Sequence, residues 1–445
     1  MTSIDHNLIP DTLDSYWMPF TASRKFREAP RFIVGARGMH YEDSTGHQVL
    51  DASAGLWCVN AGHYRERIND AIAAQLSKLD FAHSFNSGHP HAFNFANRLV
   101  PHFPDPLNHV FFTNSGSESV DTALKIALSY HQVRGQGSRQ RLIGREKAYH
   151  GMGFGGLSVG GLVKNRQSFG MLLPGTDHIR HTHDLERNAF SRGLPRHGAE
   201  LADDLQRLVD LHGAATIAAV IVEPVAGAGG VFLPPEGYLQ RLRDICTANG
   251  ILLIFDEVIT AFGRLGAASA AEKFGVVPDI MTTAKGITNA TVPMGGVFVS
   301  DEIYDTFMSI EDPGVEFSHG YTYSGHPVAC AAGLATLEIY EEENLFARAD
   351  ELADTWMDTM LSLQGEPGVI DIRTLPLIGA VELAPRPGAP MQRGTEVAKR
   401  CYEAGVWVRN IGDTLVFSPP LIITAEEIER LFGVVRDVLK GRPEP

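Results

Sequence analysis

A short apolar run that ends in two carboxylates most constrains what this chain can fold into. Residues 251–255 read ILLIF and are followed directly by Asp256 and Glu257. A short apolar run bounded by polar residues is typical of a strand buried on both faces, as in a mostly parallel sheet covered by helices. Ligands of open α/β sheets bind at the carboxyl ends of the strands, so Asp256 is expected at the functional edge.

A lysine in the next apolar stretch suggests what this edge binds. Lys285 lies between small residues (TAKG), which leave room for a covalent adduct, and burial there would lower its pKa. A lysine amine forms Schiff bases with carbonyl compounds, including pyridoxal phosphate, whose ring withdraws electrons while its nitrogen stays protonated. At 4 Å and an effective dielectric of about 20, a carboxylate stabilises that cationic ring by roughly 4 kcal/mol. Asp256 suits this role.

Neither residue alone would indicate a cofactor site, because an Asp that ends a strand usually forms a turn or cap and a lone lysine is usually solvated. Their surroundings, however, resemble the class III (ω-) aminotransferases. The family's apolar run with Asp-Glu-Val, Gly-Arg-x-Gly, Pro-Asp and Ala-Lys is matched here at 251–258, 263–266, 278–279 and 284–285. The resemblance extends from Trp17 to the last helix, and it is strongest to the β-alanine (ω-amino acid):pyruvate aminotransferases.

The resemblance implies an α/β fold of the aspartate-aminotransferase type, which is fold type I of the pyridoxal-phosphate (PLP) enzymes. We expect a large domain with a mostly parallel seven-stranded sheet and a small α+β domain. The expected boundaries are an N-terminal segment at 1–60 that joins the small domain, a PLP-binding domain at 61–335 and a C-terminal small domain at 336–445. A chain of 445 residues is long enough for both.

A second short strand, expected at 110–113, leads to a candidate phosphate site. Ser115, Gly116 and Ser117 follow it, and a helix is expected from about 119 to 133. Free N–H groups and the helix dipole favour an anion at such a turn, serine hydroxyls add hydrogen bonds and glycine allows close approach. An ordinary helix cap explains the pattern equally well. Beside the lysine and aspartate, we interpret it as the phosphate cradle.

The resemblance implies further contacts to the cofactor. Tyr149 matches the aromatic residue that stacks on the ring. Val258, two residues after Asp256 on an extended chain, would cover the opposite face. Thr322 matches a threonine that donates to the phosphate of the partner subunit, although a turn that starts a helix also explains this segment. The other expected members are His150, Gly151 and Glu223, the last of which could also simply end a strand.

Five residues are expected to contact the substrate. Trp57 matches a pocket tryptophan, with a packed loop as the alternative, and Phe85 is expected to reach a neighbouring subunit's pocket. Arg409 matches the arginine that holds the substrate carboxylate with its bidentate guanidinium, although a plain surface charge is also possible. Tyr149 and Ala226 complete the expected pocket wall.

The implied reaction transfers an amino group from an ω-amino acid or amine, with β-alanine as the first choice, to pyruvate through a PLP Schiff base and pyridoxamine phosphate. A polyamine, taurine or 4-aminobutyrate aminotransferase of the same fold is the main alternative. A PLP aminomutase or decarboxylase and a non-catalytic binding protein also stay open. The expected assembly is a homodimer with shared active sites, with a homotetramer as a further possibility.

Composition excludes several other classes. Acidic residues outnumber basic ones by 53 to 38, the net charge is −15 and no basic run occurs, so no nucleic-acid or membrane partner is expected. No apolar run approaches the roughly 20 residues needed to span a bilayer, and residues 1–20 do not form a signal peptide. Four scattered cysteines without a CxxC pair favour reduced thiols and a cytoplasmic location.

Two further motifs are not expected to be functional. Residues 151–156 fit GxGxxG, but the glycines do not join a strand to a helix and no acidic residue follows at about 20 positions. Residues 177–184 (DHIRHTHD) contain three histidines, but without cysteine or HExxH context we expect a solvated, irregular loop and no metal.

Overall fold

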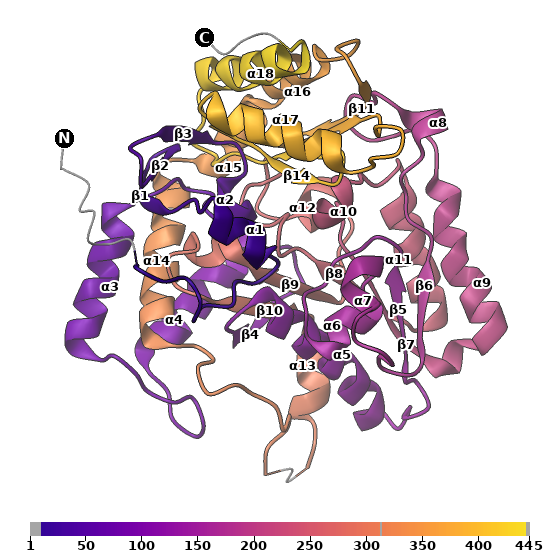
Figure 1. Cartoon of the computed structure of the whole chain (residues 1–445). Helices are drawn as coiled ribbons and strands as arrows, with labels where there is room; N and C mark the ends of the chain where they lie inside the picture. Colours follow the sequence, from indigo (N-terminus) through magenta and orange to yellow (C-terminus); the bar gives the residue numbers. More distant parts are fainter. Residues whose placement is uncertain (1–9, 312–313, 442–445) are drawn as a thin grey trace.

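The computed structural model describes residues 10–311 and 314–441, which surround a seven-stranded sheet (Figure 1). The strand order is β4-β10-β9-β8-β7-β5-β6, and every pairing is parallel except those of β10 with β4 and β9. The predicted mostly parallel seven-stranded sheet is therefore confirmed. The strands are β4 (His109–Thr113), β5 (Arg141–Arg145), β6 (Thr176–Ile179), β7 (Ile217–Val222), β8 (Leu252–Asp256), β9 (Ile280–Ala284) and β10 (Gly295–Val299).

Helices cover both faces of this sheet, as the alternation of side chains along β8 shows. Ile254 lies in a buried cluster with residues of α5 (Gly116–Val133), whereas Phe255 lies in a cluster with residues of α9 (Asp203–His212) and α11 (Tyr238–Asn249). Successive side chains of a strand point to opposite faces, so the run at 251–255 is apolar throughout. Each fully buried Leu, Ile or Phe contributes about 1.5–3 kcal/mol.

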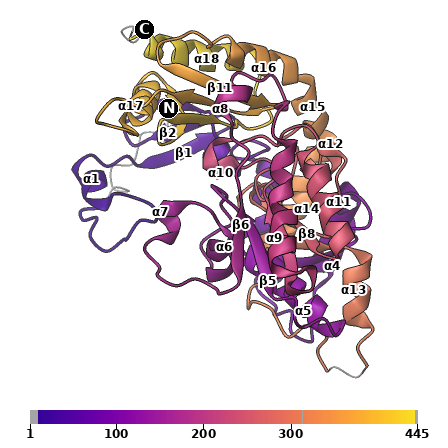
Figure 2. The same cartoon turned by 90° about the vertical axis from the view of Figure 1, so that its right-hand side faces the viewer.

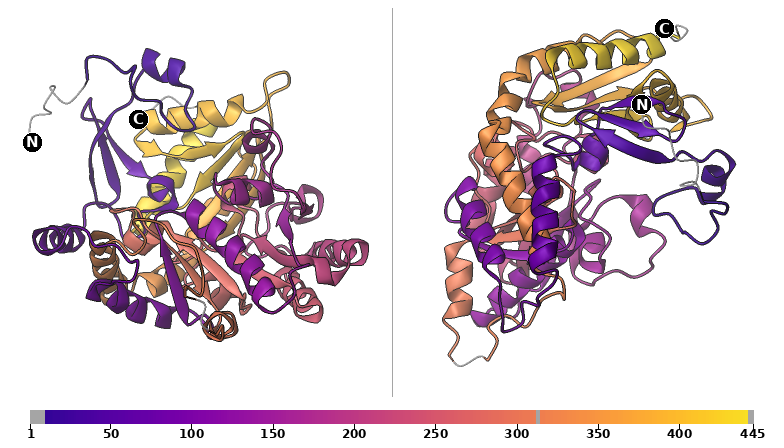
Figure 3. Two further views of the ribbon diagram at one scale, coloured as in Figure 1. Left: turned by 90° about the horizontal axis from the view of Figure 1, so that it is seen from below. Right: turned by 90° about the vertical axis from the view of Figure 1, so that its left-hand side faces the viewer.

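The two ends of the chain form a second unit on top of the sheet (Figure 3). Strand β13 (Val406–Trp407) pairs in parallel with β3 (Gln48–Asp51), which continues antiparallel to β2 (His40–Asp43) and β1 (Ile33–Arg37). An antiparallel sheet in the order β11-β12-β15-β14 lies beside it. Its strands and the helices next to them are β11 (Val369–Leu375), β12 (Ile378–Leu383), β14 (Arg409–Ile411), β15 (Thr414–Phe417), α16 (Ala353–Leu361), α17 (Gln392–Glu403) and α18 (Ala425–Leu439).

The other helices lie before, between and around the strands of these two units. Within the described ranges, none of the helices combines the length and the apolar composition needed to cross a membrane. The remaining helices are α1 (Ser23–Glu28), α2 (Ala54–Trp57), α3 (Glu66–Lys78), α4 (Pro90–Leu99), α6 (Phe154–Val159), α7 (Val163–Arg166), α8 (Leu185–Asn188), α10 (Gly227–Gly230), α12 (Ala270–Phe274), α13 (Asp301–Met308), α14 (Pro327–Glu342) and α15 (Leu345–Glu351).

Two expectations about local structure were wrong. Helix α5 begins at Gly116, three residues before the expected start, because Ser115 caps it by accepting from the Glu118 N–H at 3.2 Å. The expected irregular loop at 177–184 begins as strand, since β6 pairs in parallel with β5 at the edge of the sheet. Polar residues are tolerated there because an edge strand is only half covered.

A buried arginine ties the large sheet unit to both chain ends. Arg264 is fully buried and donates to the carbonyls of Leu377 and Pro419 at 3.0 and 2.6 Å, and to Asn60 Oδ1 at 2.8 Å. Burial lowers the pKa of Arg264 to about 10. One guanidinium therefore satisfies acceptors from three segments that are far apart in sequence.

We expect Arg264→Ala to lower the free energy of unfolding by about 3 kcal/mol, because it leaves three buried acceptors without donors and creates a cavity. The urea midpoint of the protein would measure this. The matched control is Arg37→Ala, whose exposed side chain pairs with Glu66 at 3.4 Å and should contribute less than about 1 kcal/mol. Equal losses in the two variants would contradict a clamping role for Arg264.

Candidate active site

A cavity of about 950 Å³ opens where the carboxyl edge of the large sheet meets the unit built from the chain ends. It is lined by Trp57, Tyr149, Lys285 and Arg409, which come from α2, the segment after β5, the end of β9 and the start of β14. The structure thus brings four predicted site residues to one cavity. Its position at the carboxyl ends of parallel strands is where α/β folds bind ligands.

Lys285 is held in a strained and desolvated position. It follows β9 directly and has a φ of +54°, a left-handed conformation that is uncommon outside glycine and often occurs at functional sites. Burial lowers the pKa of Lys285, and the charge of Arg409 lowers it further, whereas Cys58 and Asp256 act in the opposite direction. Within the described ranges, no acceptor meets its amine. The amine of Lys285 therefore loses its proton more easily than that of a solvated lysine, which suits a nucleophile.

Asp256 ends β8 as a buried carboxylate whose orientation is fixed. His150 Nδ1 lies 2.7 Å from one carboxylate oxygen, and Thr282 Oγ1 and the Val258 N–H each donate to the other at 3.2 Å. His150 is itself buried, and its other ring nitrogen has no partner in the part of the chain that the structure describes. A carboxylate held by so many donors stays oriented toward whatever cationic group enters beside it.

The expected phosphate cradle lies against Val258 and Ala284, which follow Asp256 and precede Lys285. A Cβ at Gly116 would meet Val258 at 2.9 Å and Ala284 at 3.6 Å, so only glycine lets the start of α5 approach the lysine segment. Gly151 has a φ of +89° and packs on Ser117, whose Oγ accepts from the Met152 N–H at 3.2 Å. The first N–H groups of a helix have no intrahelical acceptor and point at a bound anion.

The reasoning that placed Val258 was wrong, although the residue does lie at the site. The chain does not stay extended after Asp256: β8 ends there and the backbone turns, with the Val258 N–H bonded to the Asp256 side chain. The valine reaches Gly116 through this turn and not through strand alternation.

Glu223 supports the pocket wall from behind. Its two oxygens accept from the N–H groups of Tyr149 and Gly227 at 3.0 and 3.2 Å, and burial raises its pKa to about 7. The expected wall residue Ala226 is 2 % exposed and is paired through its backbone with Phe232, so Ala228 lines the cavity in its place. Glu223 thus fixes the backbone of Tyr149 at the cavity wall.

Phe85 and Thr322 lie outside the cavity of their own chain. Phe85 is 56 % exposed, and Thr322 is also exposed. The Phe85 ring packs against Gly320, two residues before Thr322, where an added Cβ would lie 3.2 Å from it. The two predicted residues therefore share one surface, and neither touches the cavity formed by the described residues of the same chain.

Several lining residues were missed by the sequence analysis. Ile259 lines the cavity and faces Trp57 across Gly227. Cys58 does not line it but raises the pKa of Lys285 through its charge. Lining residues next to Trp57 and Arg409 in the sequence, such as Leu56 and Val408, could have been predicted from that proximity. The lining residues around α7 could not, because that loop carries no recognisable motif. The further lining residues include Arg31, Leu56, Leu162, Val163, Lys164, Asn165, Lys399, Trp407, Val408 and Ile411.

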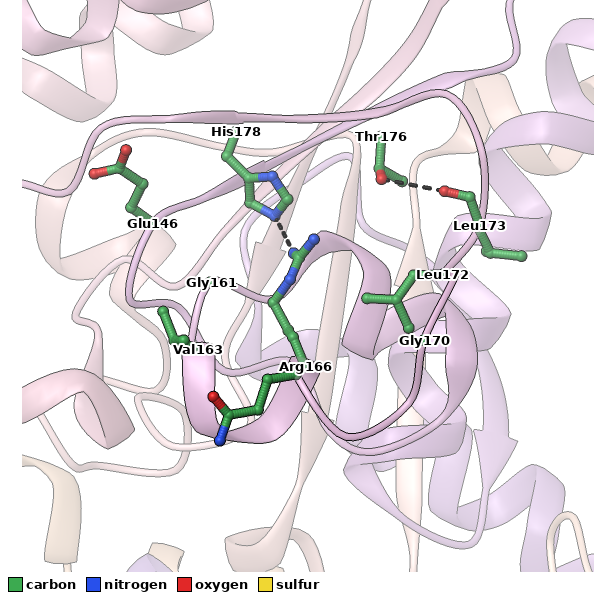
Figure 4. A pocket seen from close by; sticks show the side chains of 10 residues that line it. Glu146, Gly161, Val163, Arg166, Gly170, Leu172, Leu173, Thr176 and His178 are labelled. Atoms are coloured by element: carbon green, nitrogen blue, oxygen red, sulfur yellow. Dashed lines mark hydrogen bonds between the residues drawn. The ribbon is translucent and has the colours of Figure 1, made fainter.

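A second hollow, of about 630 Å³, lies on the other side of α7 and shares Val163 with the first (Figure 4). In it Arg166 and His178 point toward one another, 2.8 Å apart, and Arg166 also donates to the Ser158 carbonyl at 2.9 Å. One terminal nitrogen of this arginine is thus used in contacts within the protein. The hollow contains no lysine, so the reactive amine belongs to the larger cavity.

The histidine-rich segment contributes to an ionic cluster. His183 lies 3.2 Å from Glu382, and Asp371 is close enough for the three to form a metal-ligand set. However, Arg373 donates to both carboxylates and already occupies this position with a cation. The described side chains therefore form a network of ion pairs that joins β6's end to β11 and β12.

A lysine at the carboxyl edge of this sheet, with an oriented carboxylate and an anion cradle beside it, defines a PLP-dependent enzyme of fold type I. The chain belongs to the class-III aminotransferases, whose sequence pattern matches residues 21–439. Class-III aminotransferases use PLP. Lys285, Asp256 and the start of α5 fit its aldehyde, ring nitrogen and phosphate, respectively.

Similar proteins agree with this assignment. An ω-aminotransferase of Caulobacter vibrioides is 57 % identical, with 96 % of this chain and 97 % of that protein aligned. A β-alanine–pyruvate aminotransferase of Pseudomonas aeruginosa is 50 % identical, with 96 % of each aligned. The PLP-bound amine transaminase structure from an uncultivated Pseudomonas species has a TM-score of 0.91 and 35 % identity over 98 % of this chain and 100 % of that chain.

We expect the rate at which the cofactor-free protein attaches PLP covalently to rise with pH, with a midpoint below 10.5. That value is the ordinary pKa of a lysine, and the pKa of Lys285 is lowered by desolvation and by the charge of Arg409. The rise of the cofactor absorbance after mixing would measure it. Arg409→Gln should move the midpoint to higher pH by removing a neighbouring cation. A midpoint at or above 10.5, or a downward move in the variant, would contradict this electrostatic description.

Proposed function

We propose that this aminotransferase moves an amino group from an ω-amino acid, with β-alanine as the first choice, to pyruvate. The observation that carries the proposal is that Arg409 lines the same cavity as Lys285 and lies close enough for its charge to lower the pKa of that lysine. A guanidinium so near the reacting amine suits substrates whose carboxylate is only a few bonds from the amine carbon or keto carbon. The names of the Caulobacter and Pseudomonas relatives support the same class.

Bound PLP supplies an electron sink for the substrate carbon. With PLP bound, Lys285 Nζ would be the group that accepts and returns the proton of the substrate carbon, because desolvation lowers its pKa. Asp256 would pair with the ring nitrogen and favour its protonated form, and Tyr149 and Trp57 would hold the reactants from the sides. Because the amine donor and the keto acid both present a carboxylate, Arg409 orients each of them in turn.

Same-fold alternatives differ in what they require of this pocket. A 4-aminobutyrate or taurine donor would also use Arg409, whereas a polyamine donor carries no anion and would gain nothing from it. Apolar amines would contact Trp57 and Tyr149 after Arg409 swings aside. The arginine therefore favours the acidic donors among the alternatives.

The decisive experiment is a donor panel of β-alanine, 4-aminobutyrate, taurine, putrescine and 1-phenylethylamine, each assayed against pyruvate and 2-oxoglutarate. We expect the largest kcat/KM for β-alanine with pyruvate. Lys285→Ala should lower turnover by at least about a thousandfold, because no other amine replaces the proton carrier. Turnover like that of the wild type in this variant, or putrescine as the best donor, would reject the proposal.

We further propose a homodimer in which each subunit completes the other's site. Phe85 and Thr322 lie on one surface outside their own cavity, and the exposed rings of Phe81, Phe93 and Tyr323 add apolar area there. Exposed aromatic patches of this kind mark protein interfaces. A partner seated on this surface would bring Thr322 to the phosphate cradle of the neighbouring subunit.

Subunit mixing tests this arrangement. Thr322→Val alone should release PLP more readily, because one donor to the phosphate is lost. In a mixed dimer with Lys285→Ala, the lysine of one subunit and the threonine of the other make one complete site, so activity and cofactor retention should recover to about half of the wild-type values. If mixing restores nothing, Thr322 does not serve a partner's site.

We also propose a cytoplasmic location. The four cysteines, Cys58, Cys246, Cys330 and Cys401, are all free, and the last three are buried. Free, dispersed thiols are typical of proteins that remain in a reducing compartment.

A further inference from the structure

The active-site cavity continues well beyond Lys285 and Arg409. Its wall carries three more cations, Arg31, Lys164 and Lys399, which come from the N-terminal segment, α7 and α17. Figure 2 shows these three parts of the chain on the same side of the molecule. No Asp or Glu of the described chain lines this cavity, although the protein has a net charge of −15. The cavity wall is therefore cationic within an acidic protein.

Arg31 is the cation best prepared to bind a ligand. Its guanidinium lies 3.3 Å from the centroid of the Tyr402 ring and 6.0 Å from that of Trp407. Stacking fixes the plane of the guanidinium and leaves the N–H donors along its edge free. Among the residues that the structure describes, no hydrogen-bond acceptor or carboxylate meets them. By contrast, Lys399 pairs with Glu403 at 3.6 Å.

Arg31 and Arg409 occupy different depths of the cavity. Arg409 is partly buried and acts electrostatically on Lys285 and Tyr149 at the reacting end. Arg31 is solvent-exposed, stacks on α17 and also borders the separate hollow formed by the N-terminal residues around Tyr16. It therefore lies at the mouth.

We propose that Arg31, assisted by Lys164 and Lys399, is a second carboxylate-binding position that accepts ω-amino acids too long to be held by Arg409. This inference rests on the proposed function. Pockets of roughly 300–1,000 Å³ typically hold drug-sized ligands, so a cavity of about 950 Å³ exceeds what β-alanine and pyruvate fill beside the cofactor.

The wall between the two arginines suits a methylene chain. Leu56, Trp407, Val408 and Ile411 line the cavity together with the cations. A long donor with its amine carbon at Lys285 would lay its chain on these apolar side chains and present its carboxylate to the open edge of Arg31. A short donor would end at Arg409 instead, so the two arginines sort substrates by length.

The test compares each ω-amino acid with the alkylamine of the same length, using pyruvate as the acceptor. For each pair, the ratio of the two kcat/KM values isolates the contribution of the carboxylate. We expect Arg31→Gln to lower the ratio of 8-aminooctanoate to octylamine by about tenfold or more, as expected for the loss of a charge-assisted hydrogen-bonded pair. The ratio of β-alanine to propylamine should change by less than about twofold, since that carboxylate is held elsewhere.

Arg37→Gln is the matched control, because Arg37 also lies over a tyrosine, Tyr64, at 5.1 Å but does not line this cavity. It should alter neither ratio. Arg31→Lys keeps the positive charge but not the bidentate guanidinium, so it should lower the ratio of 8-aminooctanoate to octylamine less than Arg31→Gln does. If Arg31→Gln lowers turnover of acids and alkylamines alike, or leaves both ratios unchanged, the second position does not exist. No turnover of any donor by the wild-type enzyme would instead reject the proposed function.

Discussion

The site depends on the desolvation of one amine. A lysine in water carries its proton at neutral pH and cannot act as a base, whereas burial at the end of β9 lowers the pKa of Lys285. The register of the sheet supplies the rest. Asp256 on β8 lies opposite Thr282 on β9, three residues before the lysine, and this threonine holds the carboxylate. Two adjacent parallel strands thus fix the position of Asp256 relative to Lys285, the two residues to which we assign the ring nitrogen and the proton transfer.

The large sheet alone would not make a pocket. Trp57 and Arg409 come from the two ends of the chain, which are joined through β3 and β13 and fastened to the large unit by Arg264. The arginine stays charged among neutral carbonyls, which is a costly arrangement unless every acceptor is well placed. The substrate site therefore forms only when the terminal unit packs on the large sheet. Loss of the Arg264 contacts would lower both stability and activity.

Sequence reasoning succeeded where local rules decide the structure. The apolar runs at 251–255 and 110–113 predicted β8 and β4 to within one residue at each end. It failed where the chain turns. Val258 was placed by assuming an extended backbone, Ala226 was chosen where Ala228 faces the cavity, and the start of α5 moved because Ser115 caps it. Such outcomes depend on hydrogen bonds between residues that no periodic pattern connects.

Arg31 belongs to the same class of failure, since nothing in its neighbourhood of the sequence marks it. Only the packing of the N-terminal segment on Tyr402 brings it to the cavity. The electrostatics of the whole chain would otherwise repel acidic substrates, because the net charge is −15. Interactions with distant charges are screened beyond roughly 8 Å at physiological salt, however, so a carboxylate near the mouth responds mainly to the cations beside it. A donor whose anion and amine are far apart could therefore bind the outer arginine with its carboxylate while its amine reaches Lys285, as proposed above.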